Sequence, residues 1–375
     1  MARSCRDSRQ DRAIVAATVV VGRVLLRGQA LSVGAATVLK VTQTLTHGDF
    51  DTITSPLRGE LVAHCYRMLG SVQDAEDQVQ ETYLRAWRAF GGFEGRSSVR
   101  TWMYQIATRT CLTALQQRAR RPMPTGLGAP SSDPADDITA QHEVPWLEPL
   151  PDAMLAGPGS DPAAVAATKD GVRLAFVAAL QHLTPLQRAV VILRDVLAFS
   201  AVETAQALEV SVASANSALQ RARARLSQLP RTDDPPATAD PADLAGRQKD
   251  LLGRFMQAFE AYDTDAVVAL LAADATWEMP PFPQWYSGAQ AIAGLVRHQC
   301  PANAPDDLRY VPTSANGQPA CAGWLRGDDG VYRAFQLMVL DVEGGPDGPR
   351  VRHVSCFFDT ALFEKFGLPE ILPPR

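Results

Sequence analysis

The sequence predicts a multidomain protein in which two all-α domains are followed by an α+β domain. The chain of 375 residues is too long for one ordinary domain. Apolar residues recur at helical spacing over residues 50–121 and 171–229, whereas β-type alternation is confined to the C-terminal part. We therefore predict a disordered N-terminal extension (1–48), a first helical domain (49–122), an acidic linker rich in Pro and Ala (123–168), a second helical domain (169–230), a short linker (231–242) and a C-terminal domain (243–375).

The charge of the chain is segregated along its length. The net charge of -5 and the apolar share of 46% describe an ordinary globular protein. Residues 95–122 and 210–230 nevertheless contain arginines and no acidic residue, while acidic residues dominate the stretch between them. Two basic islands joined by an acidic connector favour two contacts with a polyanion.

The six cysteines are scattered, without a CxxC pair or a nearby pair of histidines. This spacing argues against a structural zinc site and a disulfide framework, and it fits reduced thiols in the cytoplasm. Nowhere does the sequence reach the roughly 18 consecutive apolar residues that a membrane helix needs. We therefore expect a cytoplasmic protein without metal, cofactor or membrane contact, and we assign no role to residues 1–48.

Clear start and stop signals bound the helices of the first helical domain. A helix in "SPLRGELVAHCYRMLGS" ends at Gly70, and Ser71, three residues ahead of Asp74, predicts a capping box for "DAEDQVQETYLRAWRAF". The glycine-rich loop "GGFEGRSS" then leads into "VRTWMYQIATRTCLTALQQRARR". This stretch is predicted to be a long helix that Pro122 and Pro124 stop.

The helix that follows Ser71 carries a compact polar strip. Asp77, Gln80 and Glu81 stand at positions i, i+3 and i+4, so three acceptors share one strip of its surface. Taken alone, this acidic strip is explained equally well as a solvated face. A second stripe is apolar and is predicted to face a core; it comprises Val79, Tyr83, Ala86, Trp87 and Phe90.

The second helical domain contains helix-turn-helix spacing. Thr184 is predicted to cap a helix that has Pro185 at its first position. The stretch "AFSAVETAQALEVSVASANSALQRARARL" then predicts a short helix, a tight turn and a second helix rich in arginine. Glu209 and Val210 stand where the usual glycine of the turn is expected, so an ordinary helical hairpin is the alternative. The arginines and the missing acids favour DNA binding.

Within the C-terminal domain the sequence pattern changes from helical spacing to β-type alternation. Helices are predicted over residues 243–262 and 265–271, and β-type runs over 324–325, 332–340 and 351–359, with turns at "RGDDG" and "EGGPDG". No nucleophile, metal set or phosphate-binding loop stands out, so no catalytic residue is predicted. Candidate pocket residues are aromatic or polar, and packing in a core explains the aromatic ones equally well. They are Trp277, Met279, Phe282, Trp285, Tyr286, His298, Gln336 and His353.

Together these stretches resemble the extracytoplasmic-function (ECF) subfamily of sigma-70-type RNA polymerase sigma factors. "GSVQDAEDQVQETYLRAW" and "FEGRSSVRTWMYQIATRTCL" look like sigma region two, and "LTPLQRAVVILRDVLAFSAVETAQALEVSVASANSALQRARARL" looks like region four. The C-terminal part, with "TWEMPPFPQWYSG" and "ANGQPA", is similar to the cone-shaped SnoaL-like domain that a subset of the subfamily carries. The sequence is most similar to the actinobacterial sigma factor G type, and the resemblance covers nearly everything after residue 50.

The resemblance implies that the first helical domain binds core RNA polymerase. In the family, the β′ clamp helices of the core contact the acidic and amide positions of a "DxVQE" signature. Here those positions are Asp77, Gln80 and Glu81. Charged contacts of this kind set orientation and encounter rate more than raw affinity.

The resemblance also implies a contact with the minus-ten promoter element. Arg96, Arg100 and Arg109 are expected to meet phosphates or bases, because burying an unpaired arginine is costly. Trp102 and Tyr104 are expected either to stack on a base or to pack in the core. The family often has asparagine where Arg109 stands, which leaves the identity of the flipped base open.

In region four the second helix is implied to enter the major groove at the minus-thirty-five element. Asn216 and Gln220 can pair with adenine, Arg221 with guanine, and Ser217 lies on the same surface. Arg223 is expected to meet phosphates or the β flap of the polymerase.

We therefore predict a sigma factor that directs promoter recognition, DNA melting and initiation, with its C-terminal domain modulating activity. Core polymerase and promoter DNA are the expected partners, and a small-molecule ligand or an anti-sigma protein would add control. One alternative is a helix-turn-helix regulator with a ligand-sensing domain, which leaves the acidic strip unexplained. The other is a cyclase- or isomerase-like enzyme, which explains still less of the sequence.

Overall fold

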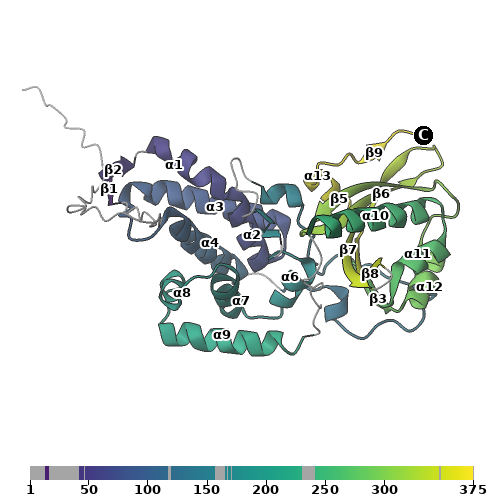
Figure 1. Ribbon diagram of the computed structural model, residues 1–375, viewed down its shortest axis with the longest axis horizontal. Coiled ribbons are helices and arrows are strands. Elements are labelled where there is room, and N and C mark those ends of the chain that lie inside the picture. The colour runs from purple at the N-terminus through teal and green to yellow at the C-terminus, as the bar shows by residue number, and fades with distance from the viewer. Residues whose placement is uncertain are drawn as a thin grey trace, which may run out of the picture.

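A computed structural model describes residues 13–16, 42–45, 47–116, 120–156, 165–166, 168–169, 171–229, 241–345 and 348–374. The molecule is elongated, with the helical domains at one end and the C-terminal domain at the other (Figure 1). Of the N-terminal extension that we expect to be disordered, the structure describes two short strands, β1 (Ala13–Ala16) and β2 (Thr42–Leu45), which pair antiparallel. Its remaining residues up to 46, apart from these strands, lie outside the described part of the chain.

The first helical domain is a bundle in which α2, α3 and α4 all pack against one another. Ser71 caps α3 by accepting a hydrogen bond from the Asp74 backbone N–H at 3.2 Å, which is one half of the predicted capping box. Gly70 ends α2 in the left-handed region at φ 71°, where a Cβ atom would lie 2.8 Å from Leu147. The elements are α1 (His47–Thr54), η1 (Ser55–Leu57), α2 (Arg58–Leu69), α3 (Val72–Ala89), η2 (Phe90–Gly92) and α4 (Val99–Leu115).

The second helical domain forms the predicted helix-turn-helix. Thr184 and Ser200 each make a full capping box, at α7 and α8. Glu209 adopts the left-handed conformation at φ 55° that a glycine usually supplies in this turn. The elements are α6 (Leu174–Leu180), α7 (Pro185–Val191), the π-helical turn η5 (Ile192–Val196), α8 (Ala201–Leu208) and α9 (Val212–Leu226).

The C-terminal domain packs helices against a mixed, seven-stranded sheet with the order β4-β3-β8-β7-β6-β5, and β9 pairs with β7. Neighbours are antiparallel except for β3 and β8. Asn316 and Gly317, at φ 57° and 69°, form the tight turn between β5 and β6. The elements are α10 (Pro241–Glu260), α11 (Thr264–Leu270), β3 (Leu271–Met279), β4 (Phe282–Ser287), α12 (Ala289–Gln299), β5 (Leu308–Ala315), β6 (Gln318–Arg326), β7 (Tyr332–Gly345), β8 (Gly348–Phe357), α13 (Leu362–Lys365) and β9 (Ile371–Leu372).

Several elements of this domain are not predicted from the sequence, namely α12, β3, β4 and β5. Pro283 lies within β4 and Pro312 within β5, and these are the two outermost strands of the sheet's main path. A proline is tolerated at a sheet edge because its missing N–H leaves no ladder partner unsatisfied. The same prolines obscure the strand pattern in the sequence.

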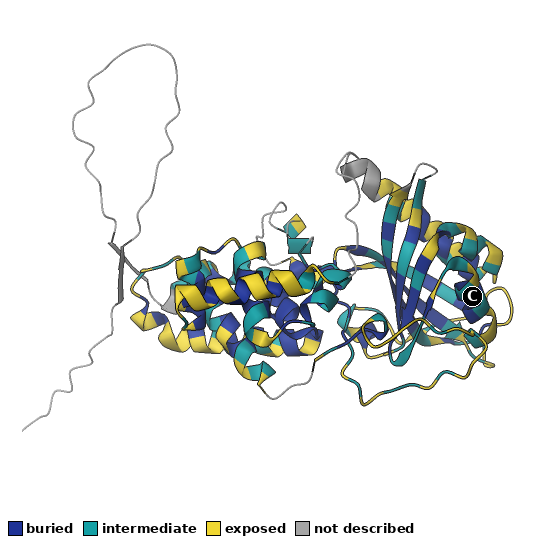
Figure 2. Cartoon of the chain, turned by 90° about the horizontal axis from the view of Figure 1, so that it is seen from below, coloured by how far each residue is buried: buried dark blue, intermediate teal, exposed yellow. Residues whose placement is uncertain are grey.

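The acidic linker is packed against the domains on both sides of it. Its apolar residues Leu147, Leu150 and Leu155 are 0 to 2% exposed and belong to a hydrophobic core shared with both helical domains. Two short helical turns, η3 (Pro124–Gly126) and η4 (Asp152–Leu155), interrupt it. Figure 2 shows buried residues between the packed helices and along the strands. The linker therefore contributes to a core that joins the domains.

Candidate functional site

The acidic strip on α3 faces solvent. Asp77 and Gln80 are exposed, and the Glu81 side chain is 37% exposed. Within the helix Asp77 accepts a hydrogen bond from Gln73 Nε2 at 3.2 Å, and Glu81 forms an ion pair with Arg85 at 2.6 Å. The predicted strip is therefore a surface that carboxylate and amide groups share, and among the residues that the structure describes no other domain covers it.

An apolar surface continues the strip along α3. Leu84 is 51% and Trp87 is 41% exposed. Both side chains line an open groove of about 490 Å³ between α1 and α3. The other residues that line this groove are Phe50, Asp51, Ser55, Arg58, Gln80 and Tyr83. Our prediction that Trp87 belongs to the core stripe is wrong for that ring, because it lies at the outer edge of the bundle. Leu84 and Trp87 follow Gln80 by four and seven residues, and this spacing was the signal that could have assigned them to the exposed face.

Arg96 lies in the loop before α4 and Arg100 in the first turn of α4, and each has a carboxylate partner within the first helical domain. Arg96 pairs with Glu94 at 3.0 Å and keeps 85% of its side chain exposed. Arg100 pairs with Glu60 at 2.7 Å, and its guanidinium carbon lies 4.9 Å from the centre of the Tyr104 ring. Both side chains remain accessible to a polyanion.

The two aromatic residues predicted for this surface differ in burial. The half-buried Trp102 ring packs 4.8 Å from Phe93 and 6.3 Å from Phe90, measured between ring centres. Tyr104 is 1% exposed and donates a hydrogen bond to Glu60 at 3.0 Å. The prediction that Tyr104 contacts DNA is therefore corrected: its ring packs in the core and holds Glu60 in place. Its pKa rises above the usual range because it is buried beside that carboxylate.

Arg109 is held by the second helical domain. Its Nε donates to the Ala207 carbonyl and its Nη2 to the Gln206 carbonyl, both at 3.1 Å. Its Nη1 pairs with Glu209 at 3.0 Å. These carbonyls lie at the C-terminal end of α8, where a cation also complements the helix dipole. Arg109 thus joins α4 to the helix-turn-helix.

The predicted DNA-reading residues of α9 project into solvent. Asn216, Ser217, Gln220 and Arg221 are all exposed. Arg223 is also exposed, and it forms a two-atom contact with Asp195 at 2.5 and 3.0 Å. The structure therefore brings Asn216, Ser217, Gln220 and Arg221 together on one open face. Arg223, by contrast, is paired with Asp195.

Two further arginines hold the helical domains together, and sequence reasoning missed both. Arg188 of α7 is 3% exposed and donates to the carbonyl of Met68 at the end of α2, as well as to the carbonyl of Leu180 at 3.0 Å. Arg67 of α2 is 2% exposed and donates to the Gly171 carbonyl at 2.7 Å. Burial lowers the pKa of each to about 10, so both remain charged near neutral pH.

The turn between β5 and β6 reaches from the C-terminal domain into the helical domains. Asn316 is 0% exposed, and its Nδ2 donates to the Tyr66 hydroxyl at 2.9 Å and to the Val172 carbonyl at 2.6 Å. Its Oδ1 accepts from the Leu150 backbone N–H at 2.8 Å. One side chain therefore bonds to α2, to the linker and to the segment that leads into α6.

Neighbouring contacts extend this junction. Gln318 Oε1 accepts from the Leu174 backbone N–H at 2.9 Å, at the start of α6. Arg173 forms an ion pair with Asp341 of β7. The motif "ANGQPA", singled out in the sequence, thus contacts both helical domains.

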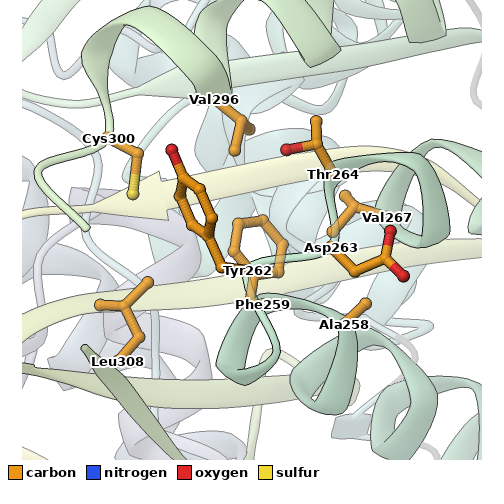
Figure 3. A pocket seen from close by; sticks show the side chains of 9 residues that line it. All are labelled: Ala258, Phe259, Tyr262, Asp263, Thr264, Val267, Val296, Cys300 and Leu308. Atoms are coloured by element: carbon orange, nitrogen blue, oxygen red, sulfur yellow. The ribbon is translucent and has the colours of Figure 1, made fainter. Parts of the chain in front are cut away.

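The candidate residues for a ligand pocket are divided between the core and the surface of the C-terminal domain. Trp277, Met279, Tyr286 and Gln336 are 0 to 5% exposed and packed, whereas His298 lies exposed on α12. A small cavity in this domain holds about 10 Å³, the room of a single water (Figure 3). It shares none of our eight candidates, being lined by Ala258, Phe259, Tyr262, Asp263, Thr264, Val267, Val296, Cys300 and Leu308.

The other three candidates lie at the surface where the linker crosses the sheet. Trp285 Nε1 donates to the Gly128 carbonyl of the linker at 3.1 Å, and the half-buried Phe282 packs against Phe358. His353 Nε2 lies 2.7 Å from the buried carboxylate of Glu278. Burial alone would lower the pKa of His353, but the charge of Glu278 and the hydrogen bond to it raise the pKa above its usual value.

In the part of the chain that the structure describes, three or more His, Cys, Asp or Glu side chains nowhere gather as a metal-ion site. Within the same residues, none of the helices combines the length and apolar character needed to cross a membrane.

Comparisons with known proteins match three parts of the chain. The family models described as Sigma-70 region 2, Sigma-70 region 4 and SnoaL-like domain match residues 55–121, 173–226 and 252–357. The chain is 53% identical to the ECF RNA polymerase sigma factor SigG of Mycobacterium tuberculosis over 327 residues, 87% of this chain and 85% of that protein. It is 31% identical to SigJ of the same organism over 332 residues, 83% of this chain and 91% of that protein. The crystal structure of SigJ has the same fold, with a TM-score of 0.54 and 24% identity over 85% of this chain and 99% of that one.

Proposed function

The chain belongs to the ECF RNA polymerase sigma factors, and on that premise we propose which of its surfaces bind core polymerase and promoter DNA. As a sigma factor it is a transcription regulator: it binds core RNA polymerase and directs initiation at promoters. Its place of action is with the polymerase, in the cytoplasm. The remaining task is to assign these activities to residues.

The acidic strip is the core-binding surface. Asp77, Gln80 and Glu81 lie open on α3, and this observation carries the proposal. Leu84 and Trp87 extend the strip with exposed apolar area. A polar strip beside an aromatic anchor is the composition typical of protein interfaces, in which the apolar part supplies affinity and the charges supply orientation.

Charge reversal tests this assignment. In Asp77→Lys/Glu81→Lys we expect binding to core polymerase to weaken by about 100-fold, because two attractive charges become repulsive in a partly desolvated contact. Stability should change by less than about 1 kcal/mol, since both positions are exposed and the new lysine at 81 only opposes Arg85. Affinity for core polymerase and run-off transcription measure the effect.

Asp265→Lys is a matched control for that double variant. The Asp265 side chain is 91% exposed and lies on α11 of the C-terminal domain. It should bind core polymerase like the unaltered chain. Full transcription by the double variant would show that another surface docks the polymerase.

Promoter contacts are assigned to two surfaces. Asn216, Ser217, Gln220 and Arg221 form the open face of α9 that reads the minus-thirty-five element. Arg96 and Arg100, with the half-buried Trp102, approach the minus-ten element from the first helical domain. Replacing Gln220 by alanine should relax base preference at one minus-thirty-five position, whereas Arg96→Gln should weaken binding to all promoters and reduce its salt dependence.

The C-terminal domain modulates the activity by bracing the two helical domains against each other. The supporting observation is Asn316, whose side chain joins α2, the linker and the segment before α6. A chain that ends after residue 230 should initiate at a different level or with a different promoter preference than the full chain in run-off transcription. Equal activity and equal preference of the two chains would remove this role.

A further inference from the structure

The arginines of α9 differ in how they are held. Arg223 contacts Asp195, which lies 28 residues earlier in the π-helical turn η5. Its Nε donates to Asp195 Oδ2 at 3.0 Å, and its Nη2 donates to Asp195 Oδ1 at 2.5 Å. Among the described residues, neither Arg221 nor Arg225 has such a carboxylate partner. The acid therefore fixes one arginine of α9 and leaves the other two without this restraint.

The turn that carries Asp195 is anchored in the core of the second helical domain. Ile192 and Leu193, at the start of η5, are 0% exposed. The Leu197 backbone N–H donates to the Ile192 carbonyl at 2.9 Å, and the Phe199 backbone N–H donates to the Leu193 carbonyl at 2.8 Å. The carboxylate of Asp195 is thus held in one place, and so is the guanidinium that pairs with it.

Arg223 lies on the face of α9 assigned to promoter reading. At about 100° per residue, it is about 20° around the helix from Asn216 and about 60° from Gln220. It also lies about 10 Å farther along the helix axis than Asn216, toward the C-terminal end. Because the N-terminal residues of a recognition helix contact base edges, a residue this far along meets the phosphate backbone at the edge of the groove. Its side chain is 60% exposed and open to such a contact.

The pairing leaves the outer edge of the guanidinium open. Of its five N–H donors, Asp195 takes one on Nε and one on Nη2. Both N–H groups of Nη1 and the second one of Nη2 remain, and they present the fork that matches two oxygens of a phosphate. A carboxylate beside DNA costs electrostatic repulsion. The position of Asp195 is therefore explained if its pairing orients Arg223 for that phosphate.

We propose that Asp195 is a positioning residue for promoter recognition, which holds Arg223 as a preformed clamp for one phosphate beside the minus-thirty-five element. This inference rests on the proposed function, because it requires α9 to lie in the major groove. A phosphate contact fixes the register of a recognition helix on the duplex without reading sequence. Asp195 thus acts through Arg223, and it sharpens the base contacts of Asn216 and Gln220 by limiting the positions that α9 can take.

Binding of the holoenzyme to a pool of duplexes of randomised sequence tests the proposal. The full chain is assembled with core polymerase, and the selectivity is the ratio of the affinity for the best-bound duplex to the affinity for an unrelated duplex. We expect Asp195→Asn to lower this selectivity by about tenfold, because the charge-assisted pair that orients Arg223 is lost. Affinity for the unrelated duplex should not fall, since the variant removes a negative charge near the phosphates.

Two further variants locate the effect. Arg223→Gln should lower the same selectivity and reduce the salt dependence of binding, and adding Asp195→Asn to it should have no further effect. Glu209→Gln is the matched control, because it removes an exposed acid from the turn of the same helix-turn-helix without touching Arg223. It should keep the selectivity. Melting curves verify that each variant is folded, which we expect because an exposed ion pair contributes little to stability.

Three results would overturn the proposal. Tighter binding of Asp195→Asn to both kinds of duplex at unchanged selectivity would mean that the carboxylate only masks Arg223. An equal loss on both kinds would mean that it merely supports α9. Unchanged selectivity and salt dependence in all folded variants would mean that Arg223 does not contact the promoter.

Gln220→Ala separates these failures from a failure of the proposed function. If it changes the base preference while Asp195→Asn keeps the selectivity, α9 reads the minus-thirty-five element and only the role of Asp195 is wrong. If it also leaves the base preference unchanged, the assignment of α9 to the minus-thirty-five element is wrong.

Discussion

The surface assigned to core polymerase is open, whereas Arg109, which the sequence predicts to contact the promoter, is held by the second helical domain. Asp77 and Gln80 on α3 are exposed to solvent. Arg109 on the adjacent α4 is engaged with the carbonyl groups at the end of α8. The acidic strip and Arg109 belong to one helical bundle. In this arrangement the strip is open for a partner, whereas Arg109 is engaged by the second helical domain.

Domain packing alone can therefore separate the two binding activities, binding to core polymerase and contact with the promoter. The acidic strip is exposed on α3 in this arrangement of the domains. The Arg109 side chain is 45% exposed, and movement of α8 away from α4 would release its hydrogen bonds to the carbonyls of α8. The buried Arg67 and Arg188, which donate to carbonyls across the same junction, oppose that movement.

Breaking the junction at Asn316 should have the largest effect. Asn316→Ala removes three buried hydrogen bonds and puts alanine in a left-handed conformation. We expect the free energy of unfolding to fall by about 3 to 4 kcal/mol, at about 1 kcal/mol for each bond and for the strained backbone. Urea unfolding should then separate into more than one transition, while affinity for core polymerase through the acidic strip is kept.

Asn316→Gly is the matched control, because it loses the same side chain without backbone strain. It should be about 1 kcal/mol more stable than the alanine variant. If Asn316→Ala unfolds like the unaltered chain, the junction does not hold the domains together and the contrast between the two surfaces has another cause.

Acid should lower the stability of the first helical domain, which carries both the acidic strip and Arg109. Burial, assisted by the charge of Arg67, lowers the pKa of His64 to about 3. Its unfolded pKa is about 6.5, so the unfolded chain binds the proton more readily and stability falls as the pH drops below that value. From pH 6.5 to pH 5 the expected loss is about 2 kcal/mol. Urea unfolding at the two pH values measures it, and His64→Gln should abolish it.

His353 in the C-terminal domain should show the opposite sign. Its folded pKa is raised by Glu278, so its contribution is complete below the unfolded pKa of about 6.5 and is lost as the pH rises through the folded value. The first helical domain then loses stability as the pH falls, whereas the C-terminal domain loses stability as the pH rises. If the free energy of unfolding changed equally between pH 5 and 6.5 in His64→Gln and in the unaltered chain, the assignment of the acid effect to His64 would be wrong.

Removing Arg109 should have a smaller effect on stability. Arg109→Ala loses two hydrogen bonds to α8 and one exposed ion pair, and the expected cost is about 1 kcal/mol because its side chain is 45% exposed. Glu209→Gln loses only the ion pair and should cost less than about 0.5 kcal/mol. Hydrogen exchange at the C-terminal end of α8 should accelerate in the first variant and not in the second. Equal exchange in both would mean that Arg109 does not hold α8.

Much of the helical part could be predicted from residues that lie near one another in the sequence. Ser71, Thr184 and Ser200 cap their helices through side chains only three residues from their partners. The acidic strip follows equally from spacing along one helix. Such features depend on backbone geometry within a turn or two, which the order of residues dictates.

Burial and pairing could not be predicted in the same way. Tyr104 and Trp87 are both aromatic residues at helical spacing, yet the first is buried and the second is 41% exposed. Whether an aromatic ring is covered depends on which segment packs over it. The strands β4 and β5 were missed because proline is acceptable at an edge, and a strand's place at an edge is known only once the sheet is assembled.

By itself the sequence determined the order of the domains, the helix-turn-helix and the residues on the outer face of α3, because these depend on local spacing and on charge. The tertiary structure alone decided that Arg109 binds α8, that Asn316 joins three segments and that Arg120 meets His182. The physical reason is distance along the chain: a hydrogen bond between residues 62 or more apart leaves no periodic trace in the sequence and exists only when the whole chain has packed.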